Sequence, residues 1–229
     1  MAAESGLSIS APPNRTLSEH IADQLRQAIL NRQLTPGQKI VESQIAKAMD
    51  TSRGPVRDAL QLLESEGLVV RHLHRGTFVA RFTIRDVEEI YTLRQAIESV
   101  ALEYLIKHAT EEQIDELDAH ARRMADMAQG EHAPWEVTEL DLDFHHTLCR
   151  LSGHGRALEA WQSLSAQTRV LLLRHQAWNP GDPATRGAES HRRLVDLLRK
   201  RDAAGAQEEL SAQLAAVMDG MLNSSSDPS

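Results

Sequence analysis

The sequence predicts a mainly α-helical protein in two parts: a winged helix-turn-helix of three helices and a β-hairpin, then an all-α antiparallel bundle of about six helices. Two short amphipathic segments, residues 41–49 and 52–66, are separated by two residues, the spacing of a helix-turn-helix. Residues 68–80 form two β-rich runs around a His-Arg-Gly turn, which indicates a hairpin or wing. From residue 83 to residue 222 the apolar residues recur with helical period.

The first domain is predicted to span residues 15–81, with its helix-turn-helix at about residues 42–61. Residues 1–14 before it are small and polar, which is typical of a disordered arm. Thr16 and Glu19 have the spacing of a capping box, so a first helix is expected to begin there and to end near Asn31. Apolar residues four apart support a helix of about four turns, namely Leu17, Ile21, Leu25 and Ile29.

The second helix of the helix-turn-helix carries two different faces. Ser52 is placed to cap its start, Pro55 fits its first turn and Gly67 ends it. Two arginines one turn apart suit a helix in a DNA major groove, where guanidinium groups reach guanine edges or phosphates. A solvated charged face is the alternative, and the neighbouring helix and wing favour DNA. The packing face comprises Val56, Ala59, Leu60 and Leu63, and the outward stripe comprises Arg53, Arg57 and Gln61.

The net charge of −8 is unusual for a DNA-binding protein, but it is divided unevenly along the 229 residues. Residues 1–81 hold ten lysines and arginines against eight acidic residues, a balance of +2, and the remainder carries −10. This asymmetry indicates that the first part meets phosphate while the second has another task. A balance of only +2 predicts DNA binding that depends on arginine placement, dimerisation and salt.

Composition also bounds the location of the protein. No long apolar run or signal-peptide pattern is visible, so a cytoplasmic protein without membrane contact is expected. The single cysteine, Cys149, excludes an internal disulfide framework. It lies within an apolar helical pattern, which predicts a small buried side chain in the core.

Residues 36–79 resemble the DNA-binding domain of the GntR family of bacterial transcription regulators. The shared features are a Pro-Gly turn at 36–37, Ser-Arg-Gly-Pro-Val-Arg at 52–57, Glu-Gly-Leu at 66–68 and a wing glycine. Ser43 stands where better-known members carry a further arginine, so base preference is not inherited. The resemblance implies principal DNA contacts from Arg53 and Arg57, neighbouring contacts from Thr51, Ser52 and Gln61, and a wing tip in the minor groove formed by His74, Arg75 and Gly76.

The second domain is predicted to span residues 84–222, before a tail at residues 223–229 that is expected to be disordered. A bundle of this kind has room for a ligand between facing helices. Its helices are predicted at about residues 86–108, 111–129, 135–152, 155–178, 185–201 and 203–222.

Several polar groups of this domain are predicted to face its interior. Asp141 and His145 are four residues apart and therefore share a helix face. His191 and Gln213 each lie on an apolar stripe. A carboxylate with two histidines matches a ligand set for a divalent metal, although each group alone also fits a hydrogen-bonded core residue.

This second part resembles the FCD ligand-binding domain of FadR-type GntR regulators over nearly all of residues 84–222. Many members bind a divalent metal through an Asp-x-x-x-His pair and two further histidines. The resemblance implies zinc or nickel ligation by Asp141, His145 and His191, whereas Gln213 stands at the fourth position. Because a neutral amide oxygen is a poor ligand for these metals, three outcomes stay open: a weakened site, water as fourth ligand, or a metal-free pocket.

Arg94 lies on the inward stripe of the first bundle helix, four residues before Glu98. A buried arginine needs an anion. That anion is either Glu98 in an internal ion pair or, as the matching position in related domains implies, the carboxylate of an effector. The effector would be a small organic acid, such as a sugar acid, hydroxy acid, amino acid or aromatic acid.

Together these features predict a homodimeric, sequence-specific transcription regulator, most simply a repressor, that binds double-stranded operator DNA. Its DNA binding would respond to a small carboxylate held by Arg94, Asp141, His145, His191 and Gln213. One alternative is a DNA-binding dimer with a structural bundle that binds no ligand. A metal-dependent hydrolase is a remote alternative, because no separate general base, nucleophile elbow or phosphate loop accompanies the cluster, and an enzyme is not predicted.

Overall fold

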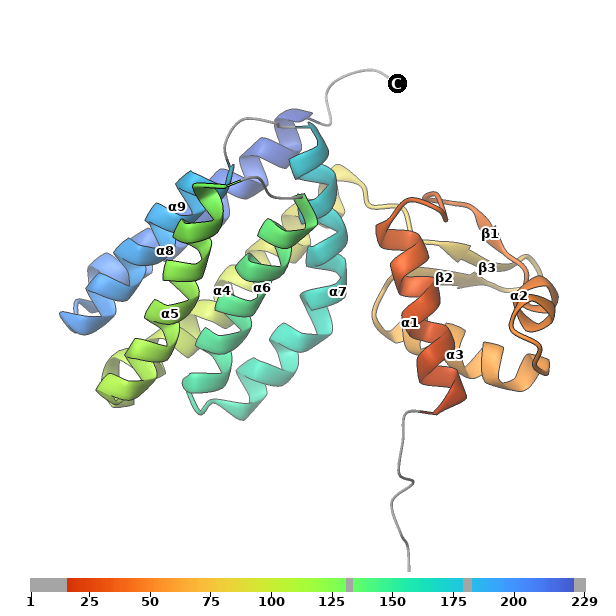
Figure 1. Ribbon diagram of the computed structural model, residues 1–229, viewed down its shortest axis with the longest axis horizontal. Helices are drawn as coiled ribbons and strands as arrows, with labels where there is room; N and C mark the ends of the chain where they lie inside the picture. The colour runs from red at the N-terminus through yellow and green to blue at the C-terminus, as the bar shows by residue number, and fades with distance from the viewer. Residues whose placement is uncertain (1–15, 131–133, 179–182, 225–229) are drawn as a thin grey trace, which may run out of the picture.

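The computed structural model describes residues 16–130, 134–178 and 183–224, which form two domains lying side by side (Figure 1). The arm expected at residues 1–14 lies outside the described residues, as do residues 225–229 of the expected tail. The architecture is mainly α-helical, as predicted. Among the described residues, no helix has the length and apolar composition needed to span a bilayer.

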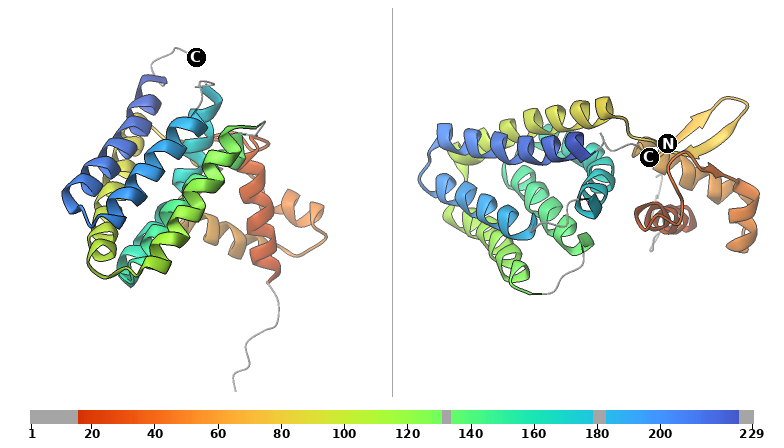
Figure 2. Two further views of the ribbon diagram at one scale, coloured as in Figure 1. Left: turned by 60° about the vertical axis from the view of Figure 1, so that its left-hand side comes forward. Right: turned by 90° about the horizontal axis from the view of Figure 1, so that it is seen from above.

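The N-terminal domain is the predicted winged helix-turn-helix with one additional strand. Thr16 and Glu19 close the predicted capping box at the start of its first helix. The extra strand pairs Ile40 with Thr77 of the hairpin, so the sheet has three antiparallel strands in the order β1-β3-β2. The β2–β3 hairpin extends away from the other domain (Figure 2). The elements are α1 (Leu17–Leu30), β1 (Lys39–Ile40), α2 (Glu42–Ala48), α3 (Arg53–Ser65), β2 (Val69–His72) and β3 (Gly76–Val79).

One predicted detail of this domain, the capping of α3 by Ser52, is wrong. Ser52 stands at the N-cap position of α3, but its side chain makes no capping hydrogen bond. The third residue of α3, a usual donor to a cap, is Pro55, which has no N–H to donate. Of the four apolar residues spaced along α1, Ile21, Leu25 and Ile29 are buried, whereas Leu17, the first residue of the helix, is 48% exposed.

The C-terminal domain is all-helical, and its helices match the six predicted ones within two residues at each end. Capping boxes at Thr83 and Thr110 start the first two helices. The first helix, α4, packs against α6, α7 and α9, and this central position buries Arg94 and Glu98. Cys149 is buried in the core, as predicted. The helices are α4 (Ile84–His108), α5 (Glu111–Ala128), α6 (Pro134–Leu151), α7 (Gly155–Trp178), α8 (Pro183–Arg199) and α9 (Ala203–Ser224).

The two domains meet along α7. Ala166 of this helix belongs to the hydrophobic core of the N-terminal domain, and Val170 packs against the same core. A hollow of about 510 Å³ lies beside this contact, between the end of α1, the sheet and α7. At Gly67, which follows α3, the backbone has φ +69° and approaches Gln167 so closely that an added Cβ would lie 2.2 Å from the amide nitrogen of Gln167.

Replacing Gly67 with alanine is expected to lower the free energy of unfolding by about 1 kcal/mol or more, because a left-handed φ is costly for any residue with a Cβ. The flexible side chain of Gln167 can move aside, so most of the loss comes from the backbone. Denaturant unfolding measures the effect. Gly155→Ala is the matched control, since its Cβ would meet nothing within 4 Å. Equal stability of the two variants would contradict the conclusion that the backbone at Gly67 requires glycine.

Candidate functional site

The outward stripe of α3 forms a candidate DNA-binding surface. Arg53, Arg57 and Gln61 are exposed, as is Ser52, while Thr51 is half-buried. Nε of Arg57 donates a hydrogen bond of 2.9 Å to a carboxylate oxygen of Glu42 on α2. The Arg57 side chain is 62% exposed, and exposed ion pairs contribute little net stability. The hydrogen bond to Glu42 orients the Arg57 side chain. Because the pair is exposed and weak, an external anion can replace Glu42 as the partner of Arg57.

The tip of the wing is exposed and turns through unusual backbone angles. His74 has φ +62° and Gly76 has φ +100°, and Arg75 lies between them. Sequence reasoning missed Lys39 of β1, whose Cε would lie 3.2 Å from a Cβ added at Gly76. Lys39 adds a positive charge beside the wing. It was missed because the two-residue strand that carries it gave no periodic signal.

The polar groups predicted to converge inside the bundle do so. Asp141 and His145 lie on α6, and His191 lies on α8. Nε2 of His191 lies 3.3 Å from Nε2 of His145 and 3.5 Å from Oδ1 of Asp141, and that carboxylate oxygen lies 3.8 Å from Nε2 of His145. Both histidines are 1% exposed or less, and the Asp141 side chain is 18% exposed.

Hydrogen bonds on the far side of each ring fix which nitrogen carries the proton. Nδ1 of His145 donates to Oε2 of Glu98 at 2.6 Å, and Nδ1 of His191 donates to the carbonyl oxygen of Gly187 at 2.6 Å. In its neutral form each ring therefore presents the lone pair of Nε2 to the centre. Burial, together with the neighbouring His145, lowers the pKa of His191 to about 4, so its imidazole is neutral near pH 7.

This arrangement fits a divalent metal. Tetrahedral ligands about 2.0–2.1 Å from zinc lie about 3.3–3.4 Å from one another, and the three ligand atoms here are separated by 3.3–3.8 Å. The His191 imidazole is neutral, and both rings are oriented by second hydrogen bonds, as those of metal ligands usually are. Asp141, His145 and His191 are therefore the residues that would hold the ion.

Glu98 of α4 organises this centre. Its side chain is completely buried, and it accepts hydrogen bonds from Nε of Arg94 at 2.6 Å and from Nε1 of Trp161 at 2.9 Å, besides that from His145. Burial alone would raise the pKa of Glu98, but Arg94 and His145 outweigh it and lower that pKa to about 2. The internal Arg94–Glu98 pair considered from the sequence is formed. The roles of Trp161 and of the Glu98–His145 contact were missed, because they depend on helix packing.

Some polar atoms around the centre have no hydrogen-bond partner among the described residues. They include Nη2 of Arg94, which lies 3.7 Å from Oδ2 of Asp141, and the hydroxyl of Tyr91. The third is Oε1 of Gln213, whose Nε2 lies 3.0 Å from Nδ1 of His191. Gln213 is buried, as predicted, but its amide faces the edge of His191 opposite to the candidate ligand atom.

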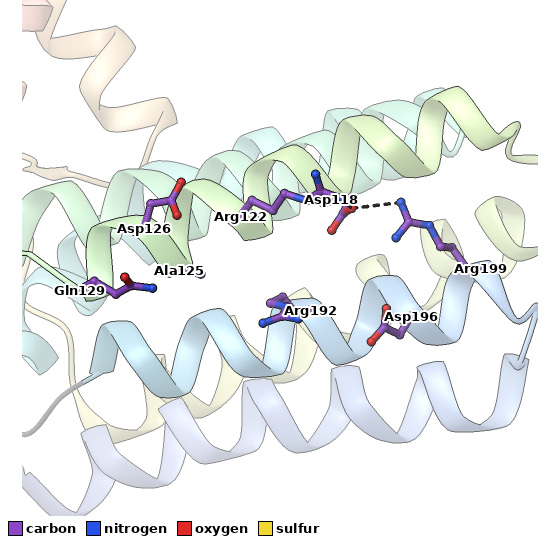
Figure 3. A pocket seen from close by; sticks show the side chains of 8 residues that line it. All are labelled: Asp118, Arg122, Ala125, Asp126, Gln129, Arg192, Asp196 and Arg199. Carbon is purple, nitrogen blue, oxygen red and sulfur yellow. Dashed lines mark hydrogen bonds and ion pairs between the residues drawn. The ribbon is translucent and has the colours of Figure 1, made fainter.

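A second hollow, of about 390 Å³, lies between α5 and α8 and is lined mostly by charged side chains (Figure 3). Asp118 accepts hydrogen bonds from Arg122 at 2.6 Å and from Arg199 at 3.1 Å. Arg192 and Asp196 face the same groove from α8 (Figure 3). Arginines and aspartates are equal in number along this lining, so we interpret the groove as an ion-pair network that joins two helices.

A winged helix with an exposed arginine stripe, joined to a helical domain around a buried polar centre, defines a DNA-binding regulator of transcription. The model of bacterial regulatory proteins of the gntR family matches residues 17–79, and the FCD domain model matches residues 89–216. The chain belongs to the GntR family of bacterial transcription regulators and carries an FCD domain.

The alignments with similar proteins cover most of the chain. The uncharacterized HTH-type transcriptional regulator YdhC of Bacillus subtilis is 30% identical over 192 residues, which are 83% of this chain and 84% of that protein. The gluconate operon transcriptional repressor of Bacillus subtilis is 28% identical over 80% of this chain and 76% of its own length. The crystal structure of a transcriptional regulator GntR from Rhodococcus sp. RHA1 has a TM-score of 0.69 at 25% identity and covers 90% of this chain and 97% of its own.

Glu98→Gln is expected to weaken zinc binding about 10- to 100-fold, as loss of an outer hydrogen bond to a ligand typically does. Both carboxylate oxygens of Glu98 accept hydrogen bonds, but the glutamine amide has only one oxygen. Its NH₂ group must therefore face another donor, either Nδ1 of His145 or the N–H groups of Arg94 and Trp161. Competition with a chromogenic chelator measures the zinc affinity. His108→Ala, at the exposed end of α4, is the control. Unchanged zinc affinity in Glu98→Gln would show that Glu98 does not orient His145.

Proposed function

We propose that the protein is a homodimeric repressor that binds operator DNA through α3 and the wing and is controlled by a small carboxylate bound inside the bundle. The observation that carries the proposal is that two oriented imidazoles and a carboxylate meet in the interior beside Arg94, whose Nη2 faces Asp141 at 3.7 Å and makes no hydrogen bond. A structural bundle without a ligand would gain nothing from leaving such donors unsatisfied.

The formal charges of the side chains around the centre favour an acidic effector whose binding requires a metal ion. Arg94, Glu98 and Asp141 together carry −1, which would repel a carboxylate. A divalent cation on Asp141, His145 and His191 would change this sum to +1, and one carboxylate would neutralise it. Burial opposes the charge of Arg94, but Glu98 and Asp141 raise its pKa above the ordinary value, so it stays positive. The bound ion would supply positive charge, while Arg94 would orient the acid.

A homodimer is proposed because a single winged helix with a balance of +2 binds DNA weakly, whereas two recognition helices engage successive major grooves of a palindromic operator. The expected DNA contacts remain Thr51, Ser52, Arg53, Arg57 and Gln61 with the wing tip. The name of the gluconate operon repressor, a similar protein, supports repression rather than activation. DNA as partner implies a cytoplasmic location.

The helix α7 offers a physical link between effector and DNA. Trp161 donates to Glu98 at the buried centre, and about one and a half turns later Ala166 lies in the core of the N-terminal domain. A ligand that shifts the balance of charges around Glu98 would therefore act on a helix that also positions the DNA-binding domain. Such control requires different effector affinities in the DNA-competent and DNA-released arrangements.

A hydrolase is not supported. Apart from the candidate ligand Asp141, the carboxylate nearest to the centre among the described residues is that of Glu98. It is buried and already accepts three hydrogen bonds. It is therefore unsuited to act as a general base.

Arg57→Ala is expected to weaken binding to an operator, selected from random duplexes by the wild-type protein, by about 1–3 kcal/mol. The reason is the loss of a guanidinium that reaches bases or phosphates from α3. Fluorescence anisotropy at fixed salt measures the change. Arg156→Ala removes an exposed, ion-paired arginine of α7 and serves as the control. Equal operator affinity of the two variants would show that Arg57 of α3 does not contact the DNA.

His191→Ala is expected to abolish the response of DNA binding to carboxylates while leaving operator affinity within about twofold, since the side chain lies in the bundle rather than at α3. Operator release is measured against a panel of small acids with and without zinc. A variant that still releases DNA in response to the acid that acts on the wild type would place the effector elsewhere.

A further inference from the structure

The most exposed large apolar side chain of the described residues stands at the tip of the wing. Leu73 is 83% exposed, whereas Leu93, the next in order, is 51% exposed. The backbone N–H of Arg75 donates to the carbonyl oxygen of His72 at 3.1 Å, which closes a turn with Leu73 and His74 at its apex. A single exposed leucine is ordinary on a protein surface, but this one projects from the hairpin of a DNA-binding domain.

Packing at the base of the turn supports the tip. His72 and Gly76 lie opposite each other in the β2–β3 hairpin, and the His72 ring lies 5.4 Å from the ring of Phe78. Nζ of Lys39, on β1, lies 5.9 Å from the centre of the same Phe78 ring. Leu73 therefore projects from a turn that three paired strands hold in place.

The neighbours of Leu73 suit the DNA backbone. His74 and Arg75 are exposed, and Lys39 lies beside Gly76 at the base of the tip. Guanidinium and ammonium groups bind phosphates, and an imidazole N–H can donate to them. With α3 in the major groove, the wing tip is expected at the adjacent minor groove. Contacts to the backbone along that groove would direct the apolar side chain at its floor.

A leucine side chain forms no hydrogen bonds, which limits where it fits in a minor groove. The floor of that groove presents acceptor atoms of the bases, and an apolar group lying on them would remove their water without replacing its hydrogen bonds. Between two base pairs, in contrast, the side chain contacts the apolar faces of the bases. Insertion is therefore the favoured position for an apolar side chain that is held against the floor.

We propose that Leu73 inserts between two base pairs in the minor groove and kinks the operator at a pyrimidine–purine step. Such steps unstack most easily, so the insertion would select them although no hydrogen bond reads their bases. The inference rests on the proposed function, because that function places the wing on operator DNA. To the expected contacts of His74, Arg75 and Gly76 it adds a residue that senses the deformability of the duplex.

The test places 2-aminopurine, one adenine at a time on either strand, in an operator selected from random duplexes by the wild-type protein. Its fluorescence rises when the base loses a stacked neighbour. With saturating wild-type protein, a rise is expected at one step in each half-site, together with a bend of about 20–90° measured by energy transfer between dyes at the duplex ends. Wild-type binding without a rise at any position would overturn the proposal.

Variants at one position separate insertion from simple contact. Leu73→Ala is expected to abolish both the rise in fluorescence and the bend, whereas Leu73→Met, which keeps an apolar side chain of similar volume, is expected to retain both. Because Leu73 is exposed, neither change is expected to disturb folding. Leu93→Ala, the same change on the exposed face of α4, is the control. An equal rise in fluorescence with Leu73→Ala would contradict the insertion of Leu73.

Replacing the unstacked step by the stiff step AA provides a second measure. This change is expected to weaken wild-type binding by about 10-fold but binding of Leu73→Ala by less than about twofold, because a side chain that does not insert needs no flexible step. Equal losses of affinity would show that the preference for the step does not arise from Leu73, which would also contradict the proposal.

The competing position for Leu73 is along the groove without insertion. In that case Leu73→Ala would weaken binding while the operator remained stacked and straight in the wild-type complex, and the proposal would be wrong. A stacked, straight operator whose binding is still weakened by Arg57→Ala would reject only this inference. A wild-type protein that prefers no duplex over any other would reject the proposed function itself.

Discussion

The structure of the buried centre depends on one carboxylate. Glu98 accepts hydrogen bonds from its own helix through Arg94, from α7 through Trp161 and from α6 through His145. A completely buried charge is stable only when such partners surround it, so the positions of three helices are tied to a single group. The same contact turns Nε2 of His145 toward Asp141 and His191. Helix packing and the chemistry of the site are therefore set together.

The helices around Glu98 also connect the site to the rest of the molecule. Helix α7 contacts the centre through Trp161, which donates to Glu98, and it contacts the N-terminal core through Ala166. On the far side, α8 carries His191 and is joined to α5 by the ion pair of Arg199 with Asp118 (Figure 3). Ligand groups held on packed helices are more rigid than groups held on loops. This arrangement suits a centre that reports the presence of a ligand to a distant surface.

Unsatisfied polar atoms are costly in a protein core, and here they gather where charge and geometry already indicate a ligand. Gln213 adds a neutral amide at the point where related domains are expected to carry a histidine. Because an amide oxygen is a poor ligand for zinc or nickel, and because the Gln213 amide lies beside Nδ1 of His191, the replacement leaves Asp141, His145 and His191 as the candidate ligands.

The sequence by itself determined the winged helix-turn-helix, the six bundle helices and the inward orientation of Asp141, His145, His191 and Gln213, because these follow from caps and helical periodicity. It did not reveal the short strand β1, since two residues give no alternation, nor the failure of Ser52 to cap a helix with Pro55 at its third position. Only the tertiary structure decided that Glu98 binds Arg94, Trp161 and His145 at once, and that the Gln213 amide lies beside Nδ1 of His191. The physical reason is that periodicity specifies which face of a helix is buried, whereas the side chains that meet there are decided by how distant helices pack.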